Sequence, residues 1–248
     1  MRTVVVGASS GLGRCLAVGL GKRGATVALM ARRKDRLADA AKETGPGAVA
    51  IVCDVTDEVS TRSALGQAAD ALGGIDALVY ATGIGPLARL ADTDAAMWRT
   101  LFDTNVIGAS LVTAAAIPHL AASNGVAAYL SSTSASLTPA FPGLGAYAVS
   151  KAALNKLVEA WRGEHPGVGF TQVTVGDCAG GAGDSMTEFA NDWDPALAVE
   201  MGTIWSARQY IVGSLLEVEE LISVVDTVLR CGETACIPAV AVVPRPPG

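Results

Sequence analysis

Formal charge is scarce in this sequence. Asp, Glu, Lys and Arg make up 17% of its 248 residues, and hydrophobic residues make up 50%, whereas an average soluble domain is about 25% charged. The shortage is concentrated between Thr104 and Ser150, 47 consecutive residues without any of the four charged types. This composition excludes an intrinsically disordered chain. We therefore expect much of the stretch to be buried, either in the fold or against copies of the same chain.

The uncharged stretch also lacks a long apolar run. A membrane-spanning helix needs about 20 consecutive apolar residues, but polar residues recur here, from Asn105 and Ser110 to the Ser and Thr residues at 131–134. No cleavable leader pattern follows Met1. These absences predict a cytoplasmic protein without a membrane partner.

Paired cysteines and basic runs are missing as well. The five cysteines lie far apart and form no C-x-x-C pair, which predicts free thiols in a reducing compartment and neither a disulfide scaffold nor a metal site. The net charge is −6, with no long basic run. The sequence therefore gives no support for nucleic-acid binding.

What the sequence does contain is an alternation of short apolar runs and helical segments. The runs are continuous, as in parallel strands that are covered on both faces. Strands are predicted at 3–6, 26–31, 48–53, 76–80, 126–131, 169–175 and 236–242, and helices at 11–23, 34–43, 58–72, 93–121, 146–164 and 215–230. This pattern predicts an α/β fold, a single Rossmann-like domain over 1–248, in which a doubly wound sheet of about seven mostly parallel strands has helices on both faces. A flexible tail is expected at 244–248.

A glycine-rich turn follows the first predicted strand, with the spacing Gly-x3-Gly-x-Gly. Glycines let the backbone turn tightly and approach a diphosphate, whose charge the N-terminus of the next helix stabilises. A preceding strand and a following helix are the context that supports a nucleotide site. The candidate contacts are Gly7, Ser9, Ser10, Gly11, Leu12 and Gly13.

The end of the second predicted strand indicates which dinucleotide would bind. A site for NAD usually has Asp or Glu there, to bind the ribose 2′-hydroxyl, whereas this chain has Arg32 and Arg33. Arginine suits a 2′-phosphate through charge-assisted hydrogen bonds, which predicts NADP(H); the alternative is that both arginines are solvated loop charges. Asp54, after the third strand, is either an acceptor for the adenine amino group or an ordinary polar strand end.

Tyr147 and Lys151 lie at positions i and i+4 of a predicted helix, so their side chains share one face. The ordinary pKa of tyrosine is near 10, so a tyrosine needs a nearby cation to exchange protons at neutral pH. Lys151 is the first charge after the uncharged stretch. Taken alone, such a pair is also typical of a solvated helix face.

With these motifs in view, the sequence resembles the short-chain dehydrogenase/reductase family, in its single-domain branch, over almost the whole chain. The resemblance rests on the glycine-rich turn, Asp54-Val55, Asn105 within 104–108, the serines at 131–134, and Tyr147-x3-Lys151, in the family's order. It implies an NADP(H)-dependent oxidoreductase that interconverts a small-molecule carbonyl and a secondary alcohol. The alternative is a module that binds the cofactor without turnover.

The resemblance also implies roles for individual residues. Tyr147 donates or removes the proton at the substrate oxygen, Lys151 bonds the nicotinamide ribose and favours the tyrosinate, and Asn105 holds a water that relays protons. A serine bonds the substrate oxygen: counting from the fifth strand gives Ser132, and counting back from Tyr147 gives Ser134. The more rigid register of a strand favours Ser132. The further cofactor contacts that the resemblance implies are Val55, Ala81, Gly83, Tyr147 and Lys151.

Two segments depart from the family pattern, namely Tyr80-Ala81-Thr82-Gly83 and Gly176–Gly181. The segment 180–212 is expected to form a substrate lid, rich in large apolar side chains. Those side chains belong either to the core and a subunit contact or to a pocket for an apolar or bulky substrate. The family further implies a homodimer or homotetramer that pairs helices 93–121 and 146–164.

Overall fold

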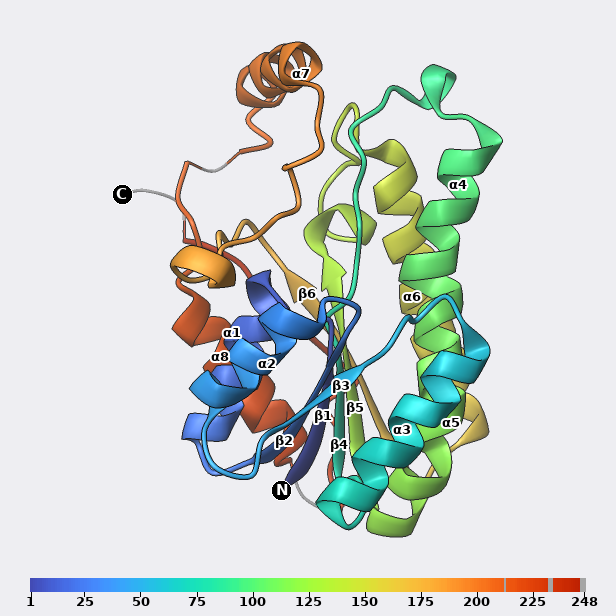
Figure 1. The fold of residues 1–248 in the computed structure, drawn as a ribbon. Coiled ribbons are helices and arrows are strands. Elements are labelled where there is room, and N and C mark those ends of the chain that lie inside the picture. The colour runs from blue at the N-terminus through green and yellow to red at the C-terminus, as the bar shows by residue number, and fades with distance from the viewer. Residues whose placement is uncertain (212, 232–233, 246–248) are drawn as a thin grey trace.

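The computed structural model describes residues 1–211, 213–231 and 234–245. Over these residues, seven strands form one sheet in the order β3-β2-β1-β4-β5-β6-β7, and every pairing is parallel (Figure 1). The predicted α/β fold is therefore confirmed. The strands are β1 (Arg2–Val6), β2 (Thr26–Ala31), β3 (Val49–Val52), β4 (Ala77–Tyr80), β5 (Val126–Ser132), β6 (Gly169–Val175) and β7 (Ala239–Val242). Residues 246–248 of the expected tail lie outside the described residues.

The strand order changes direction beside β1. The chain runs outward from β1 to β2 and β3, then returns to place β4 on the other side of β1 and continues to β7. Val6, the last residue of β1, aligns with Met30 on one side and with Tyr80 on the other. In sheets of this kind ligands bind outside the carboxyl ends of the strands, at the point where the order reverses. The topology thus places a crevice above Val6.

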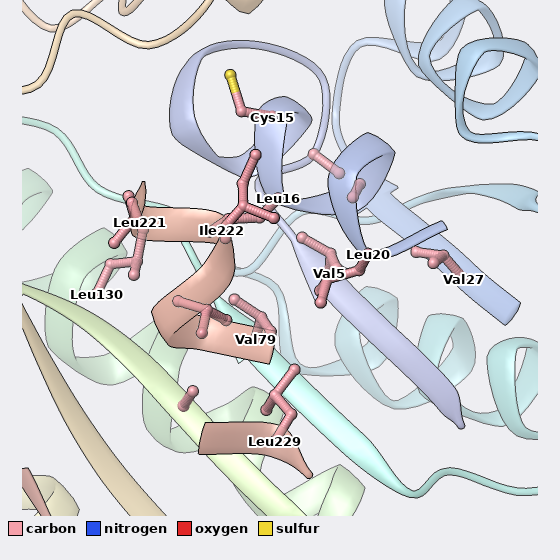
Figure 2. Close-up of a cluster of buried hydrophobic side chains, with 14 of the residues drawn as sticks. Val5, Cys15, Leu16, Leu20, Val27, Val79, Leu130, Leu221, Ile222 and Leu229 are labelled. Atoms are coloured by element: carbon pink, nitrogen blue, oxygen red, sulfur yellow. The ribbon is translucent and has the colours of Figure 1, made fainter. Parts of the chain in front are cut away.

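One face of the sheet is covered by α1 (Gly11–Lys22), α2 (Lys34–Thr44) and α8 (Val218–Leu229). Figure 2 shows part of this core, in which Leu16 and Leu20 of α1 and Leu221 of α8 lie against the sheet. Fully burying a leucine side chain contributes about 1.5–3 kcal/mol. This packing fixes α1, and with it the glycine-rich turn, on the first strand.

The other face is covered by α3 (Glu58–Leu72), α5 (Gly108–Ser123) and α6 (Gly145–Glu164), with α4 (Ala95–Phe102) beside them (Figure 1). The prediction of one helix over 93–121 is wrong in detail. A turn of π-helix, Asp103–Ile107, separates α4 from α5. Such turns occur often at functional sites, and this one contains Asn105.

Helix α7 (Pro195–Ala207) was not predicted from the sequence. Asp194 caps it by accepting a hydrogen bond from the backbone N–H of Leu197 at 2.8 Å, and Pro195 occupies the first turn. Asp before Pro is a sequence signal for a helix start. α7 packs Met201 and Trp205 on Leu87 and Leu144, which forms a small second core above the carboxyl ends of the strands. Short 3-10 turns complete the described chain at Leu90–Asp92, Thr133–Ala135 and Gly183–Ser185.

The helical stretch Ala95–Ser123 is the one described segment that is long and apolar enough to cross a membrane, judged by length and composition alone. Core helices of water-soluble proteins meet the same criterion. Two polar side chains of the stretch, Asn105 and Thr113, are fully buried and hydrogen-bonded inside the fold. The expectation of no membrane partner stays a prediction.

Candidate active site

A cleft of about 1070 Å³ opens at the carboxyl ends of the strands. Its volume slightly exceeds the upper end of the range for small-molecule pockets, about 300–1000 Å³. Apart from Asn105, every residue predicted for the site lines this cleft. They are Gly7, Ser9, Ser10, Gly11, Leu12, Gly13, Arg32, Arg33, Asp54, Val55, Ala81, Gly83, Ser132, Ser134, Tyr147 and Lys151.

The glycine-rich turn has no room for side chains. A Cβ on Gly7, whose φ is +89°, would lie 2.8 Å from the Thr82 hydroxyl, and a Cβ on Gly13 would collide with the Gly7 carbonyl. Ser10 precedes α1 in an extended conformation and makes no side-chain capping bond. The first amides of α1 are therefore left for another hydrogen-bond acceptor, and an anion is favoured at such a helix end.

Arg33, which lines the cleft, and Arg36 beside it share one carboxylate partner, and we call this pair the cationic corner. The Arg33 guanidinium donates to Ser9 Oγ at 3.0 Å and to Ser10 Oγ at 2.5 Å. It also pairs with Glu188 at 2.6 Å, and Arg36 pairs with the other oxygen of the same carboxylate. Arg32 also lines the cleft. The sequence identified Arg33 but missed Arg36, which lies one helical turn further along.

The Asp54 side chain stabilises the turn that follows β3. Its Oδ1 accepts hydrogen bonds from the Thr56 backbone N–H at 3.0 Å and from the Thr56 hydroxyl at 2.8 Å. These bonds lower the pKa of Asp54. Val55, the next residue, is buried where Gly108 passes close to the loop. One carboxylate oxygen of Asp54 thus has a local structural role.

Tyr147 lies on α6 next to the end of β5. Burial raises the pKa of its hydroxyl, and a hydrogen bond with the Ser132 side chain opposes that effect, which leaves the pKa at about 12. Ser132 Oγ lies 3.0 Å from Ser134 Oγ. The two candidate serines are thus hydrogen-bonded to each other, and of the two it is Ser132 whose side chain opposes the rise in the pKa of Tyr147.

Lys151 is a buried cation one helical turn beyond Tyr147. Its Nζ lies 5.9 Å from the centre of the Tyr147 ring and donates to the backbone carbonyl of Leu130 at 2.8 Å. Burial lowers its pKa to about 8, so it remains mostly protonated at pH 7. A Cβ on Gly83 would lie 3.1 Å from this Nζ, so the absence of a side chain at Gly83 leaves space for the ammonium group.

Asn105 ties the loop after β4 to α6. Its Nδ2 donates to the Ile84 carbonyl and to Ser150 Oγ, both at 2.9 Å, and its Oδ1 accepts from the Ile84 N–H at 2.9 Å. Both amide hydrogens and one oxygen lone pair are thus bonded to protein groups. The observed contacts give Asn105 a positioning role, and a proton relay through it stays a prediction.

The two segments that depart from the family pattern both line the cleft. Thr82 packs against Gly7, which fixes the loop after β4 on the glycine-rich turn. Asp177, after β6, is partly buried, and burial raises its pKa. Among the described residues, no group of three or more His, Cys, Asp or Glu side chains is arranged to hold a metal ion.

The predicted lid contributes both to a core and to the cleft. Met201 and Trp205 are buried in the small second core, whereas Phe189 and Trp193 line the cleft. The Phe189 ring lies 4.9 Å from the Tyr147 ring, edge to face, and Trp193 Nε1 donates to the Gly85 carbonyl at 2.8 Å. Glu188 was missed because no local pattern indicates its arginine partners, more than 150 residues earlier in the chain.

Comparison with known proteins matches the chain to the family described as short chain dehydrogenase, over residues 2–196. Among curated proteins, 11-beta-hydroxysteroid dehydrogenase 1A of Arabidopsis thaliana is 37% identical over 179 residues. The match covers 70% of this chain and 51% of that protein, so the chain spans about half the length of this relative.

Solved structures share the fold over nearly the whole chain. An alcohol dehydrogenase from Thermococcus sibiricus, complexed with 5-hydroxy-NADP, has a TM-score of 0.79 at 23% identity and covers 97% of this chain and 94% of its own. A 3-ketoacyl-(acyl-carrier-protein) reductase from Brucella melitensis, complexed with NADH, has a TM-score of 0.80 at 22% identity, with coverages of 97% and 95%. At these identities the likeness shows the fold alone.

Proposed function

The chain belongs to the short-chain dehydrogenase family, and on this premise we propose that it is an NADP(H)-dependent oxidoreductase that interconverts a carbonyl and a secondary alcohol. The observation that carries the proposal is the joint placement of Ser132, Tyr147 and Lys151 in the cleft that contains the glycine-rich turn. A proton donor, a group to hold an oxygen and a cation thus face the same space as a nucleotide cradle.

Two features of the cleft support the proposal of a phosphorylated nicotinamide dinucleotide. Gly7 and Gly13 leave room for a diphosphate, and Arg33, Arg36, Ser9 and Ser10 form a group of donors that suits a phosphate. Proteins of this family use nicotinamide cofactors. The bound nicotinamide would supply or accept the hydride.

The residues of the chain would hold the substrate and move the proton. Ser132 holds the substrate oxygen, and Tyr147 donates a proton to it during reduction or removes one during oxidation. Lys151 is proposed to stabilise the tyrosinate electrostatically, because it is buried and forms no ion pair with a carboxylate among the described residues. Phe189 and Trp193 give the pocket an apolar wall, which favours an apolar or bulky substrate.

The test is NADPH oxidation, followed by absorbance, with a panel of aldehydes and ketones. The wild type should turn over at least one of them, and Tyr147→Phe should be slower by about 10²–10⁴-fold, as expected for loss of a general acid. Tyr210→Phe removes the hydroxyl of another lid-region tyrosine and serves as the matched control. Equal rates in wild type and Tyr147→Phe would contradict the proposed chemistry.

A second candidate is a module that binds the cofactor without turnover. It is favoured by Phe189, whose ring lies against Tyr147 in the space that a substrate would need. If binding of NADPH is measurable by calorimetry while no carbonyl in the panel is reduced, the binding module replaces the enzyme as the better account.

We also propose a homodimer or homotetramer. Only 33% of the apolar window in Ala95–Ser123 is buried in a single copy, and Val149 on α6 is 48% exposed. Sedimentation at micromolar concentration should give a dimer or tetramer, and Val149→Glu should dissociate it. Val59→Glu, on an exposed site of α3, is the control that should leave the assembly intact. A monomeric wild type would contradict this proposal.

A further inference from the structure

A short segment of the lid lies across the entrance of the nucleotide cradle. We call residues Ser185–Phe189 the strap. Its N-terminal part is tied down by two backbone bonds, from the Gly181 N–H to Ser185 at 2.9 Å and from the Thr187 N–H to Ala179 at 2.9 Å. A Cβ on Gly11 would lie 3.5 Å from Thr187 Cα. The strap is therefore in contact with the first turn of α1, where a diphosphate would lie.

Glu188 of the strap occupies the cationic corner. One carboxylate oxygen lies 2.6 Å from Arg33 Nη1, and the other pairs with Arg36. Partial burial by itself would raise the pKa of Glu188, but hydrogen bonds from Arg36, Arg33 and Ser10 outweigh that effect and lower the pKa to about 2. The corner thus holds an internal anion at every physiological pH.

These ion pairs are exchangeable rather than permanent. The side chains of Arg33, Arg36 and Glu188 are 44%, 39% and 30% exposed, and ion pairs in contact with water are weak. A phosphate carries more charge than one carboxylate, and its oxygens could accept hydrogen bonds from both guanidinium groups and both serine hydroxyls at once. It would therefore compete successfully for the same donors.

Phe189 follows Glu188 directly, and its side chain packs on Tyr147 instead of the arginines. Its ring contacts Tyr147 at 4.9 Å and Trp193 at 5.5 Å between ring centres. Gly85 lies directly beneath it, since a Cβ on Gly85 would collide with the Phe189 ring. While Glu188 is held in the cationic corner, Phe189 is held over Tyr147.

We propose that Glu188 determines cofactor specificity as an internal competitor for the 2′-phosphate site, and that its displacement by that phosphate moves Phe189 off Tyr147. This inference rests on the proposed use of NADP(H). A ligand with a 2′-phosphate displaces the carboxylate and frees the strap. A ligand that lacks the phosphate leaves Glu188 paired with the arginines, so the strap stays closed over Tyr147.

The experiment compares 2′,5′-ADP with 5′-ADP, two fragments that lack the nicotinamide. Calorimetry gives their affinities for wild type, Glu188→Gln and Glu200→Gln. Glu200 is a matched control because it is also a lid carboxylate paired with an arginine, Arg89, but lies outside the cleft. Glu188→Gln should bind 2′,5′-ADP about 10-fold more tightly than wild type, because the competing charge is gone; its affinity for 5′-ADP should change less than twofold. Glu200→Gln should match wild type.

Hydrogen exchange over 183–193 gives a second readout that does not depend on activity. In wild type, 2′,5′-ADP should increase exchange in this segment and 5′-ADP should not, whereas in Glu188→Gln exchange should be raised before any ligand is added. If wild type binds 2′,5′-ADP tightly and Glu188→Gln binds it equally well, Glu188 is not a competitor, although NADP(H) use stands. If neither protein prefers 2′,5′-ADP to 5′-ADP, the 2′-phosphate site and the competitor are both refuted.

Discussion

The two cationic ends of the cleft are built in opposite ways. At one end Lys151 is 4% exposed and bonded to a neutral carbonyl. At the other end Arg33 and Arg36 are in contact with water and paired with a carboxylate of the strap. A buried cation without an ion-pair partner acts on the pKa of its neighbour. Solvated cations with a movable partner can exchange that partner for a ligand. The difference fits the proposed roles, with proton transfer at the buried end and cofactor recognition at the exposed end.

The largest effect is expected at the buried end. Lys151→Met should reduce kcat by about 10²–10⁴-fold, because Tyr147 loses the cation that supports its proton transfer. Lys156→Met, on the same helix, removes an exposed lysine paired with Glu159 and should leave kcat unchanged. Steady-state kinetics of both variants measures the contrast. If Lys151→Met kept more than a tenth of the wild-type kcat, the buried lysine would not have the catalytic role that distinguishes its end of the cleft.

The buried charge should also appear in stability. Burial lowers the pKa of Lys151 from 10.5 to about 8. Between these values the unfolded chain holds a proton that the folded protein has released, so a rise in pH stabilises the fold. From pH 8 to pH 10 the wild type should therefore gain about 2 kcal/mol of unfolding free energy relative to Lys151→Met. Urea denaturation across this range measures the gain, and a constant difference between the two proteins would count against it.

At the exposed end the expected effect is on binding. Arg33→Ala should raise the Kd for NADPH by about 10–100-fold, because charge-assisted hydrogen bonds contribute about 1.5–3 kcal/mol each, and should change the Kd for NADH far less. Arg32→Ala is the comparison, since Arg32 makes no contact with Glu188 or the two serines among the described hydrogen bonds. Titration calorimetry gives the dissociation constants of wild type and both variants for NADPH and for NADH. If Arg32→Ala raised the Kd for NADPH more than Arg33→Ala, the 2′-phosphate site would have to be assigned to Arg32 instead.

Replacing Ser132 or Ser134, at the buried end, should lower kcat by different and smaller amounts. Ser132→Ala should lower kcat about 10-fold, because the Ser132 side chain opposes the rise in the pKa of Tyr147, and loss of a hydrogen bond to a charged group costs about 1.5–3 kcal/mol at most. Ser134→Ala should lower kcat less than threefold, since Ser134 is bonded to Ser132 and has no effect of its own on the pKa of Tyr147. The reverse order in steady-state kinetics would reassign the substrate contact.

A rise in salt concentration should have the smallest effect, and it should weaken cofactor binding at the exposed end without changing kcat at the buried end. Raising NaCl from about 0.05 M to about 0.5 M shortens the screening length to a few ångströms, which weakens solvated charge pairs and leaves buried ones almost unaffected. The Kd for NADPH should rise several-fold, while kcat at saturating cofactor changes less than twofold. A salt-sensitive kcat would show that solvent reaches Lys151.

Most of the fold was predictable because its signals are local. Continuous apolar runs indicated all seven described strands, and the pair Tyr147 and Lys151 could be placed on one helix face from spacing alone. The break in the helix at Asn105 was not visible, since the π-helical turn depends on the bonds of that side chain to Ile84 and Ser150. Side-chain bonds of this kind depend on tertiary packing.

The cationic corner also depends on tertiary packing, so only part of it could be predicted from the sequence. Arg33 was found from its position after a strand, which is a local rule. Glu188 carries no such mark, because its partners lie more than 150 residues away and are reached only once α2 and the strap have folded against the same cleft. α7 is a different case, since Asp194-Pro195 is a local start signal that is visible in the sequence.

The direct succession of Glu188 and Phe189 has a consequence for redesign. One peptide bond joins the residue at the cationic corner to the residue that covers Tyr147. A library that varies position 189 to admit larger substrates would also change how firmly position 188 is seated, and thereby the preference between NADPH and NADH. Substrate range and coenzyme choice would thus be inherited together. An engineer would need to screen both traits in every round.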